Sequence, residues 1–280
     1  MSSEKIASEV KVEAVEPAWA GLYRTAGVCA LIGVAFVLLD IALSFIGGDV
    51  PTGTLGAVEW FNSFQENAFM GLRNFGLFNV INTTLAIPLY LALYRLHRGA
   101  APAFGLLALI LVLLGAAIYD ANNRALTMLS LSQQYAQAAG AAQKALLAAA
   151  GTAVLAQAED FTPGTFLGFF FSSAGSLMMM AVMLRGGLFR RWVALAGLVG
   201  TGLLLVFTIV VTFVPAAFQV MMLLAMAGGL VMLAWNIRMA IEMFGLGRAA
   251  SERTASERTA SQRTAATSAA PLRATGRMQP

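Results

Sequence analysis

Six apolar runs of about twenty residues dominate this sequence and constrain its fold more than any other feature. At a rise of about 1.5 Å per residue, each run can form a helix that crosses a hydrocarbon core of about 30 Å. Polar segments that contain arginine separate the runs. The sequence therefore predicts an all-α, polytopic integral membrane protein with six transmembrane helices, over 26–46, 75–94, 103–119, 165–184, 192–214 and 217–235.

Composition supports a chain that lies mostly in lipid. Hydrophobic residues make up 59% of the sequence and charged residues 11%, whereas about 25% of a soluble domain is charged. The single cysteine, Cys29, excludes an internal disulfide framework. The single histidine, His97, excludes two-histidine haem ligation within the chain and leaves few ligands for zinc. We expect no cofactor and no metal.

The first 24 residues differ from a cleavable signal peptide. They mix lysine with four glutamates, and the apolar run that follows is too long for the core of a signal sequence. We expect a retained cytoplasmic arm at 1–24, followed by a six-helix transmembrane domain at 25–247.

The basic residues predict the orientation of the chain. Alternating crossings place 15 of the 18 lysines and arginines on the side that holds both termini, and only Arg73, Arg124 and Lys144 on the other. An excess of Lys and Arg marks the cytoplasmic face. Both termini should therefore be cytoplasmic.

Three segments outside the six runs are expected to be helical. Leu146, Leu147, Ala150 and Val154 recur at helical spacing within the alanine-rich stretch 141–157, and a seventh crossing there would invert the arginine pattern downstream. We predict an extracytoplasmic helical hairpin between helices 3 and 4, with 122–138 as its other arm.

Residues 57–70 form the third of these segments. They should make a short interfacial helix, with Trp60, Phe61, Phe64 and Phe69 at the level of the lipid headgroups.

The C-terminal segment 248–280 changes character. It contains the repeats ASERT, ASERT and ASQRT, whose period of five fits no heptad, and its small polar residues cannot bury a core. We expect a disordered cytoplasmic tail, whose six arginines and two glutamates hold it near anionic lipid. A specific partner site is the alternative.

Polar groups within the hydrocarbon region are costly, so their positions carry information. At about 1.5 Å per residue, Asp40 lies about 21 Å from the cytoplasmic end of its helix, Asn82 about 18 Å, Asn79 about 22 Å and Asp120 about 26 Å. All four therefore lie in the outer half. In a structural interpretation, Asp40 is neutral or bonded to the two amides, which join helices at about 0.6–2 kcal/mol per bond. In a functional one, the four residues line a polar pocket that opens to the outside.

Arg73 lies at the outer mouth of the second helix, at a depth from which it can reach Asp40 or Asp120. We include it among the candidate pocket residues. The alternative is an interfacial arginine that extends to the headgroups.

Small residues and one proline predict local packing. Ala196, Gly200 and the pair Gly228 and Gly229 favour close contact between the last two helices. Pro88 should kink the second helix because it removes a backbone hydrogen bond.

Four segments are distinctive as a set: LYRTAG at 22–27, LYLALYRL at 89–96, MLSLSQQYAQA at 128–138, and TPGTFLGFFFSSAGSLMMMAVMLRGGLFRR at 162–191. In these segments the chain resembles a bacterial membrane-protein family catalogued as domain of unknown function 4386, over roughly 20–248. The resemblance implies a bacterial inner-membrane protein with six helices and an outer loop before the fourth. It implies no established activity, so no catalytic residue can be transferred.

These observations favour a non-enzymatic sensor or accessory membrane component with a polar pocket. A small-solute or ion transporter is the first alternative, although the sequence has no clear inverted repeat. A membrane-embedded enzyme is the second, and it would have few candidate catalytic groups. We expect the bilayer to be the main partner, with a second copy or another membrane protein as further candidates, and no nucleic acid.

Overall fold

Long apolar helices define the membrane part of the computed structural model, which describes residues 16–47 and 55–269. Within these residues, six helices are long and apolar enough to span a bilayer, and each overlaps one of the predicted runs. The predicted all-α, six-helix fold is therefore confirmed. The six helices are α2 (Ala20–Gly47), α5 (Phe78–His97), α6 (Pro102–Asn122), α9 (Pro163–Gly186), α10 (Arg191–Phe213) and α11 (Phe218–Ala269).

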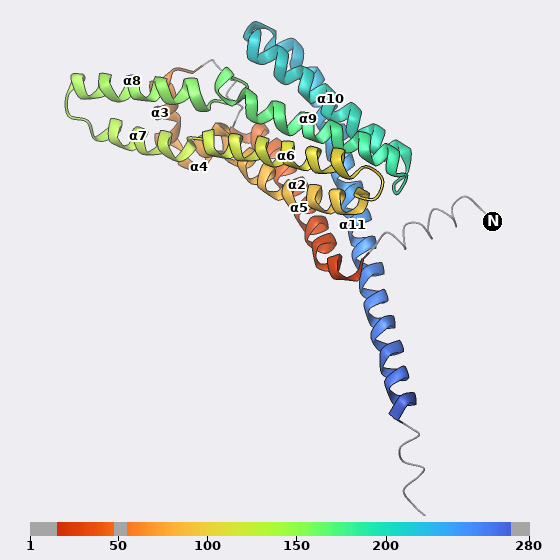
Figure 1. Cartoon of the computed structure of the whole chain (residues 1–280). Coiled ribbons are helices and arrows are strands. Elements are labelled where there is room, and N and C mark those ends of the chain that lie inside the picture. The colour runs from red at the N-terminus through yellow and green to blue at the C-terminus, as the bar shows by residue number, and fades with distance from the viewer. Residues whose placement is uncertain (1–15, 48–54, 270–280) are drawn as a thin grey trace, which may run out of the picture.

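The six helices form a ring in the order α2, α5, α6, α9, α10, α11 (Figure 1). The most extensive contact joins α6 to α9, and glycines allow it. A Cβ on Gly115 would lie 2.3 Å from the backbone nitrogen of Ser172, and one on Gly175 would lie 2.7 Å from the carbonyl oxygen of Ala108. Small residues let backbones approach closely, which is how helices associate when lipid surrounds them.

The contact between α10 and α11 follows the same rule, as the sequence predicts. A Cβ on Gly228 would lie 3.1 Å from the carbonyl oxygen of Gly200. Gly202 and Gly229 differ, because the space beside each of them is open. Close packing therefore involves Gly200 and Gly228 and leaves Gly229 available for another role.

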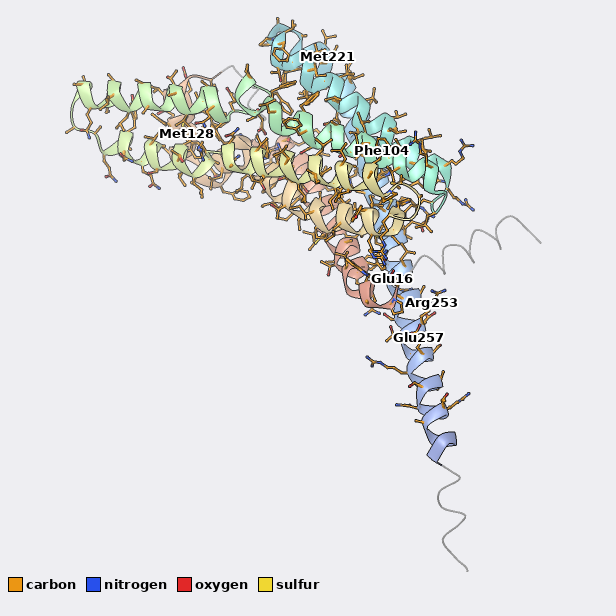
Figure 2. The ribbon with its side chains drawn as sticks, in the orientation of Figure 1. Glu16, Phe104, Met128, Met221, Arg253 and Glu257 are labelled. Carbon is orange, nitrogen blue, oxygen red and sulfur yellow. The ribbon has the colours of Figure 1, made fainter. Side chains whose placement is uncertain are left out.

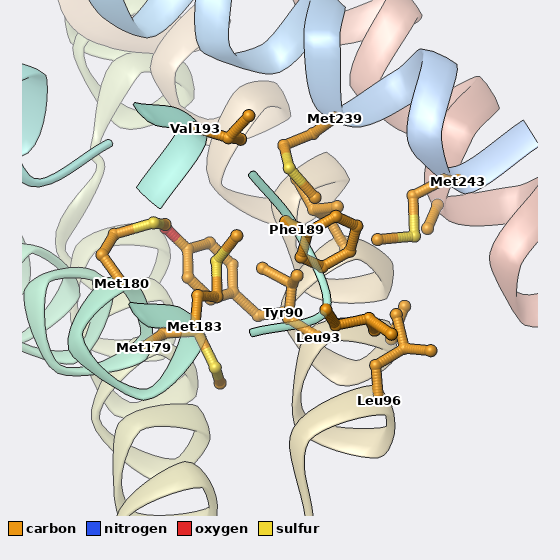
Figure 3. Packing of buried hydrophobic residues seen from close by; sticks show 14 of the residues in the cluster. Tyr90, Leu93, Leu96, Met179, Met180, Met183, Phe189, Val193, Met239 and Met243 are labelled. Carbon is orange, nitrogen blue, oxygen red and sulfur yellow. The ribbon is translucent and has the colours of Figure 1, made fainter. Parts of the chain in front are cut away.

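A sulfur-rich core packs between the membrane helices (Figure 3). Methionines from α9 and α11 pack there around Leu93 and Phe189, and all of these side chains are buried. Tyr90 donates a hydrogen bond of 2.6 Å to Ser176 within the same core. The methionines are Met179, Met180, Met183, Met239 and Met243.

Four short helices form a cap at one end of the ring (Figure 1). They are α3 (Ala57–Glu66), α4 (Ala68–Leu72), α7 (Ala125–Gln137) and α8 (Ala141–Ala158), with η1 (Pro17–Trp19) and η3 (Pro215–Ala217) as single turns elsewhere. The predicted helical hairpin between the third and fourth membrane helices is present as α7 and α8. Its apolar core, which includes Met128 and Leu155, is shared with α3.

The aromatic residues of α3 correct one expectation. Three of these rings contact protein rather than lipid headgroups, because Trp60, Phe61 and Phe64 are buried between α3 and the hairpin. Phe69 is about half exposed. Ser132 of α7 secures this contact by donating to the carbonyl oxygen of Phe61 over 2.9 Å. An amphipathic segment can bury its rings against protein as well as against lipid, and here the hairpin covers them.

The tail corrects a second expectation. We expected disorder over 248–280, but α11 continues as a single helix through Ala269 and projects from the ring (Figure 2), while 270–280 lie outside the described residues. Alanine, glutamate and arginine are good helix formers, and the repeats extend a helix that is already nucleated. Thr254 and Thr259 each donate to the carbonyl oxygen four residues earlier, over 3.1 and 2.9 Å. We call residues 248–269 the tail helix.

The connection from α4 to α5 is irregular. Residues Arg73–Leu77 form a π-turn, η2, in which Gly76 has a left-handed φ of 85° that favours glycine. Pro88, by contrast, lies inside the single helix α5. The pronounced departure from helical geometry is therefore at Gly76 rather than at the proline.

Candidate functional site

A cluster around Arg73 joins α2 to the start of α5. The Arg73 Nε donates to Oδ1 of Asp40 over 2.6 Å, and one Nη donates to the Asp40 carbonyl oxygen over 2.6 Å. Arg73 also bonds to Ser44, and to Oδ1 of Asn74 over 2.7 Å. Its side chain is only 3% exposed. Arg73 therefore pairs with Asp40, one of the two partners that the sequence suggested, and does not extend to the headgroups.

The local backbone explains how this arginine is held. Ser44 lies one helical turn after Asp40, and its hydroxyl donates to the Asp40 carbonyl over 2.9 Å. The π-turn η2 brings Arg73 against this face of α2, because Gly76 lets the chain turn before α5 begins. The Asp40 side chain remains 45% exposed.

A second cluster centres on Asp160, in the connection between α8 and α9. Its carboxylate accepts hydrogen bonds of 2.7 Å from the Tyr119 hydroxyl and from Nδ2 of Asn79. The next residue, Phe161, has a φ of 62°, which is uncommon for a residue other than glycine. The Phe161 ring stacks on Phe169, with centroids 5.1 Å apart. This packing holds the connection in a conformation that aims Asp160 at α5 and α6.

A third pair of contacts involves Asp120. Thr83 donates to Oδ1 of Asp120 over 2.7 Å, and Thr84 donates to Oδ2 over 3.3 Å. Thr83 lies four residues after Asn79, so one face of α5 presents both side chains. The two aspartates, Asp120 and Asp160, are therefore each tied to α5 by hydrogen bonds from neutral side chains.

A cavity of about 270 Å³ lies between α2, α5, α10 and α11. Most of its lining is apolar, and none of the lining residues is charged. The polar members are the amides Asn79, Asn82 and Asn236. The full lining is Cys29, Gly33, Val34, Val37, Asn79, Asn82, Leu85, Ala86, Leu204, Gly229, Met232, Leu233 and Asn236.

The three amides of the cavity differ in their partners. Asn79 donates to Asp160, and Asn236 donates to the carbonyl oxygen of Met232 over 2.9 Å. The Asn82 side chain makes no hydrogen bond to any residue that the structure describes. It faces α2 at Gly33, where a Cβ would lie 3.1 Å from the Asn82 Oδ1. Asn82 is thus the amide whose donors and acceptor are available to a ligand.

The five predicted pocket residues do not form one pocket, because the structure separates them into three sites. Asn79 and Asn82 line the cavity, Asp40 and Arg73 pair near the cap, and Asp120 bonds to Thr83 and Thr84 outside the cavity lining.

Sequence reasoning missed three participants. Asp160 and Tyr119 form the second cluster, and Asn236 lines the cavity. The sequence signal for Asp160 was weak: it is an acid directly before the fourth apolar run, at a point that periodicity assigns to a loop.

The chemistry that this arrangement offers is hydrogen bonding by neutral groups within an apolar wall. Among the described residues, no group of three or more His, Cys, Asp or Glu side chains is placed to hold a metal ion.

The six apolar helices and the helical cap define a multi-pass, all-α membrane protein. Within that class, the chain belongs to the family described as a domain of unknown function, DUF4386, whose model matches residues 25–240. The resemblance drawn from the four sequence segments is thereby confirmed. No curated protein and no solved structure matches the chain.

Proposed function

We propose that this protein is a non-enzymatic membrane sensor in which a ligand in the intramembrane cavity changes the position of the tail helix. One observation carries the proposal. α11 supplies Gly229, Met232, Leu233 and Asn236 to the cavity wall and then continues without interruption to Ala269. A ligand in the cavity would therefore contact the same rigid element that projects from the ring.

The length of the tail helix makes it a sensitive indicator of tilt. From Arg248 to Ala269 it extends about 32 Å at about 1.5 Å per residue. A tilt of about 5° at the ring would displace its end by about 3 Å, which is within the range of helix shifts in known switches. Only a ligand that binds one tilt better than the other can cause such a change.

Near the base of the tail helix, α11 contacts α2. Arg24 of α2 donates to Oγ of Ser251 over 2.8 Å. Gly247 allows close approach, since a Cβ there would lie 2.8 Å from the Arg24 side chain. Movement of α11 against α2 would therefore be transmitted at this point.

The sensor orientation that we propose places the cap outside the cell and the tail helix in the cytoplasm, in a bacterial inner membrane. The distribution of Lys and Arg supports it through the positive-inside rule. The cavity end with Asn79 then faces the outside. The four arginines of the tail helix, Arg248, Arg253, Arg258 and Arg263, would lie near anionic lipid.

A distance measurement tests the proposal without knowledge of the ligand. Spin labels are placed at Gly99→Cys, in the turn between α5 and α6, and at Thr259→Cys in the tail helix, on a Cys29→Ala background in lipid nanodiscs. Gly229→Leu fills the cavity from α11, where the space beside the glycine is open. Gly202→Leu is the matched control, since Gly202 also has open space but does not line the cavity.

We expect Gly229→Leu to shift the distance distribution between the labels, and Gly202→Leu to leave it as in the parent protein. Identical distributions in all three proteins, each with an unchanged melting temperature, would contradict the sensor proposal.

A further inference from the structure

The lining residues show that the cavity is a slot parallel to the helices. They extend along α2 from Cys29 to Val37 and along α11 from Gly229 to Asn236, which corresponds to about 10–12 Å at about 1.5 Å per residue. Dividing the cavity volume of about 270 Å³ by this length gives a mean cross-section of about 22–27 Å². The slot is therefore about twice as long as it is wide, a shape that suits a hydrocarbon chain lying along the helices.

The charge of the lining restricts the ligand further. None of the lining residues carries a charge. The nearby charged groups are already engaged, as Asp160 accepts two hydrogen bonds and Asp40 is paired with Arg73. An ion without a partner in such a slot would lose its hydration with no compensation. The buried part of the ligand must therefore be neutral.

Asn82 determines what polar group the slot would accept. Its side-chain amide offers two N–H donors and one carbonyl acceptor, and none of these is bonded to a residue that the structure describes. A hydroxyl or primary amide can donate and accept at once, so either would satisfy both sides of Asn82. Gly33, which has no side chain, leaves room beside the Asn82 oxygen.

We infer that the slot binds a single-chain, uncharged amphiphile, with its hydrocarbon chain along α2 and α11 and its hydroxyl or amide head on Asn82. The inference deepens the proposed sensor function by assigning its ligand class. Such a molecule partitions into the bilayer and can reach an intramembrane slot without a water-filled path.

Photolabelling tests this assignment directly. The full chain in phosphatidylcholine nanodiscs is irradiated with a decanol that carries a diazirine on its chain, and labelled peptides are mapped by mass spectrometry. Unlabelled 1-decanol, decane and, at pH 8, decanoate serve as competitors. They share one chain length and differ only in the head, so their order of potency reports what the slot recognises.

We expect labels on the slot residues of α2, α5 and α11, with decanol competing about 3–10-fold better than decane or decanoate. Asn82→Leu should remove the advantage of decanol over decane, and Asn82→Gln should restore part of it. Gly229→Leu should abolish labelling of the slot, whereas Gly202→Leu should not. Equal competition by all three molecules, or labelling that is the same in both glycine variants, would overturn the inference.

The two proposals can fail separately. If decanol binds the slot and the label distance to the tail helix stays fixed, the ligand class stands and the sensor function fails. If Gly229→Leu moves the tail helix but decanol does not bind, the sensor function stands and the ligand class is wrong. A phospholipid that occupies the slot, recovered with the wild type but not with Gly229→Leu, would also overturn the single-chain assignment.

Discussion

Arg73 donates to Oδ1 of Asp40 over 2.6 Å, although the two residues are 33 positions apart and belong to different segments of the fold. The arginine is almost completely buried, whereas the aspartate is nearly half exposed. The pair therefore lies at the boundary between buried and exposed surface. The buried guanidinium depends on Asp40 to compensate its charge, whereas the exposed carboxylate can also be solvated. It fixes η2 against α2, and η2 is the point where the cap passes into α5.

Removal of the guanidinium should destabilise this junction. In Arg73→Met, the Asp40 carbonyl and the Ser44 hydroxyl lose their donor, and we expect a loss of about 1–3 kcal/mol in the free energy of unfolding. Arg191→Met, at an exposed position, is the control and should change stability by less than about 0.5 kcal/mol. Unfolding in mixed micelles measures both, and equal stability of the two variants would show that the cluster contributes nothing.

Tyr119 and Asp160 should show energetic coupling. Tyr119→Phe removes one donor to the carboxylate and should cost about 0.5–1.5 kcal/mol. The double variant with Asp160→Asn should lose less than the sum of the single losses, with a coupling energy of about 0.5–3 kcal/mol. Limited proteolysis of the cap provides a second measurement, because this cluster ties the α8–α9 connection to α6. Strict additivity would mean that the hydrogen bond is not made.

Glycine at the contact of α6 and α9 should resist enlargement. Gly115→Val would place a Cβ 2.3 Å from a backbone nitrogen, and the helices must separate to accommodate it. We expect a loss of about 1–3 kcal/mol or more in thermal unfolding. Gly202→Val is the control, since a Cβ there meets no atom within 4 Å. A variant at Gly115 as stable as this control would indicate that α6 and α9 pack differently.

The orientation of the chain can be read with reporters. A tag inserted at Gly140, between α7 and α8, and a tag at the C-terminus should report opposite compartments, the first outside and the second in the cytoplasm. The physical reason is the retention of arginine-rich segments on the cytoplasmic side. Accessible-cysteine labelling in intact cells and in lysed cells gives an independent reading. Signals from the same compartment would refute the six-crossing topology.

The tail helix should be sensitive to a helix breaker. Ala255→Pro removes a backbone donor within α11 and costs about 3 kcal/mol relative to alanine. We expect circular dichroism to record a loss of helix in the full-length protein, with the melting of the ring unchanged. Ala255→Leu, at the same exposed position, should retain the signal. No difference between the two would argue that the repeats are not helical in solution.

The outline of the fold was predictable because it depends on local properties of the sequence. When lipid surrounds a run of about twenty apolar residues, its backbone N–H and C=O groups must be hydrogen-bonded within a helix. The number of crossings therefore followed from the number and length of the apolar runs. The helical spacing of Leu146, Leu147, Ala150 and Val154 likewise predicted the hairpin. The helical tail was missed because its five-residue period matches no helix-packing pattern. Ala, Glu and Arg nevertheless extend a helix that already exists.

The polar site was only partly predictable, because the depth of a residue in the membrane says nothing about its direction around the helix axis. Asp40, Asn79, Asn82 and Asp120 share a depth range, yet they face different neighbours. Only the packed structure places Asp160 against Asn79 and leaves Asn82 facing Gly33.

By itself, the sequence determined that this chain crosses a membrane six times, since hydrophobic length and backbone hydrogen bonding are local requirements. The tertiary structure decided which polar groups meet and where a slot remains between α2, α5, α10 and α11. Those outcomes depend on helix rotation and on contacts between residues distant in the chain, which no periodicity encodes.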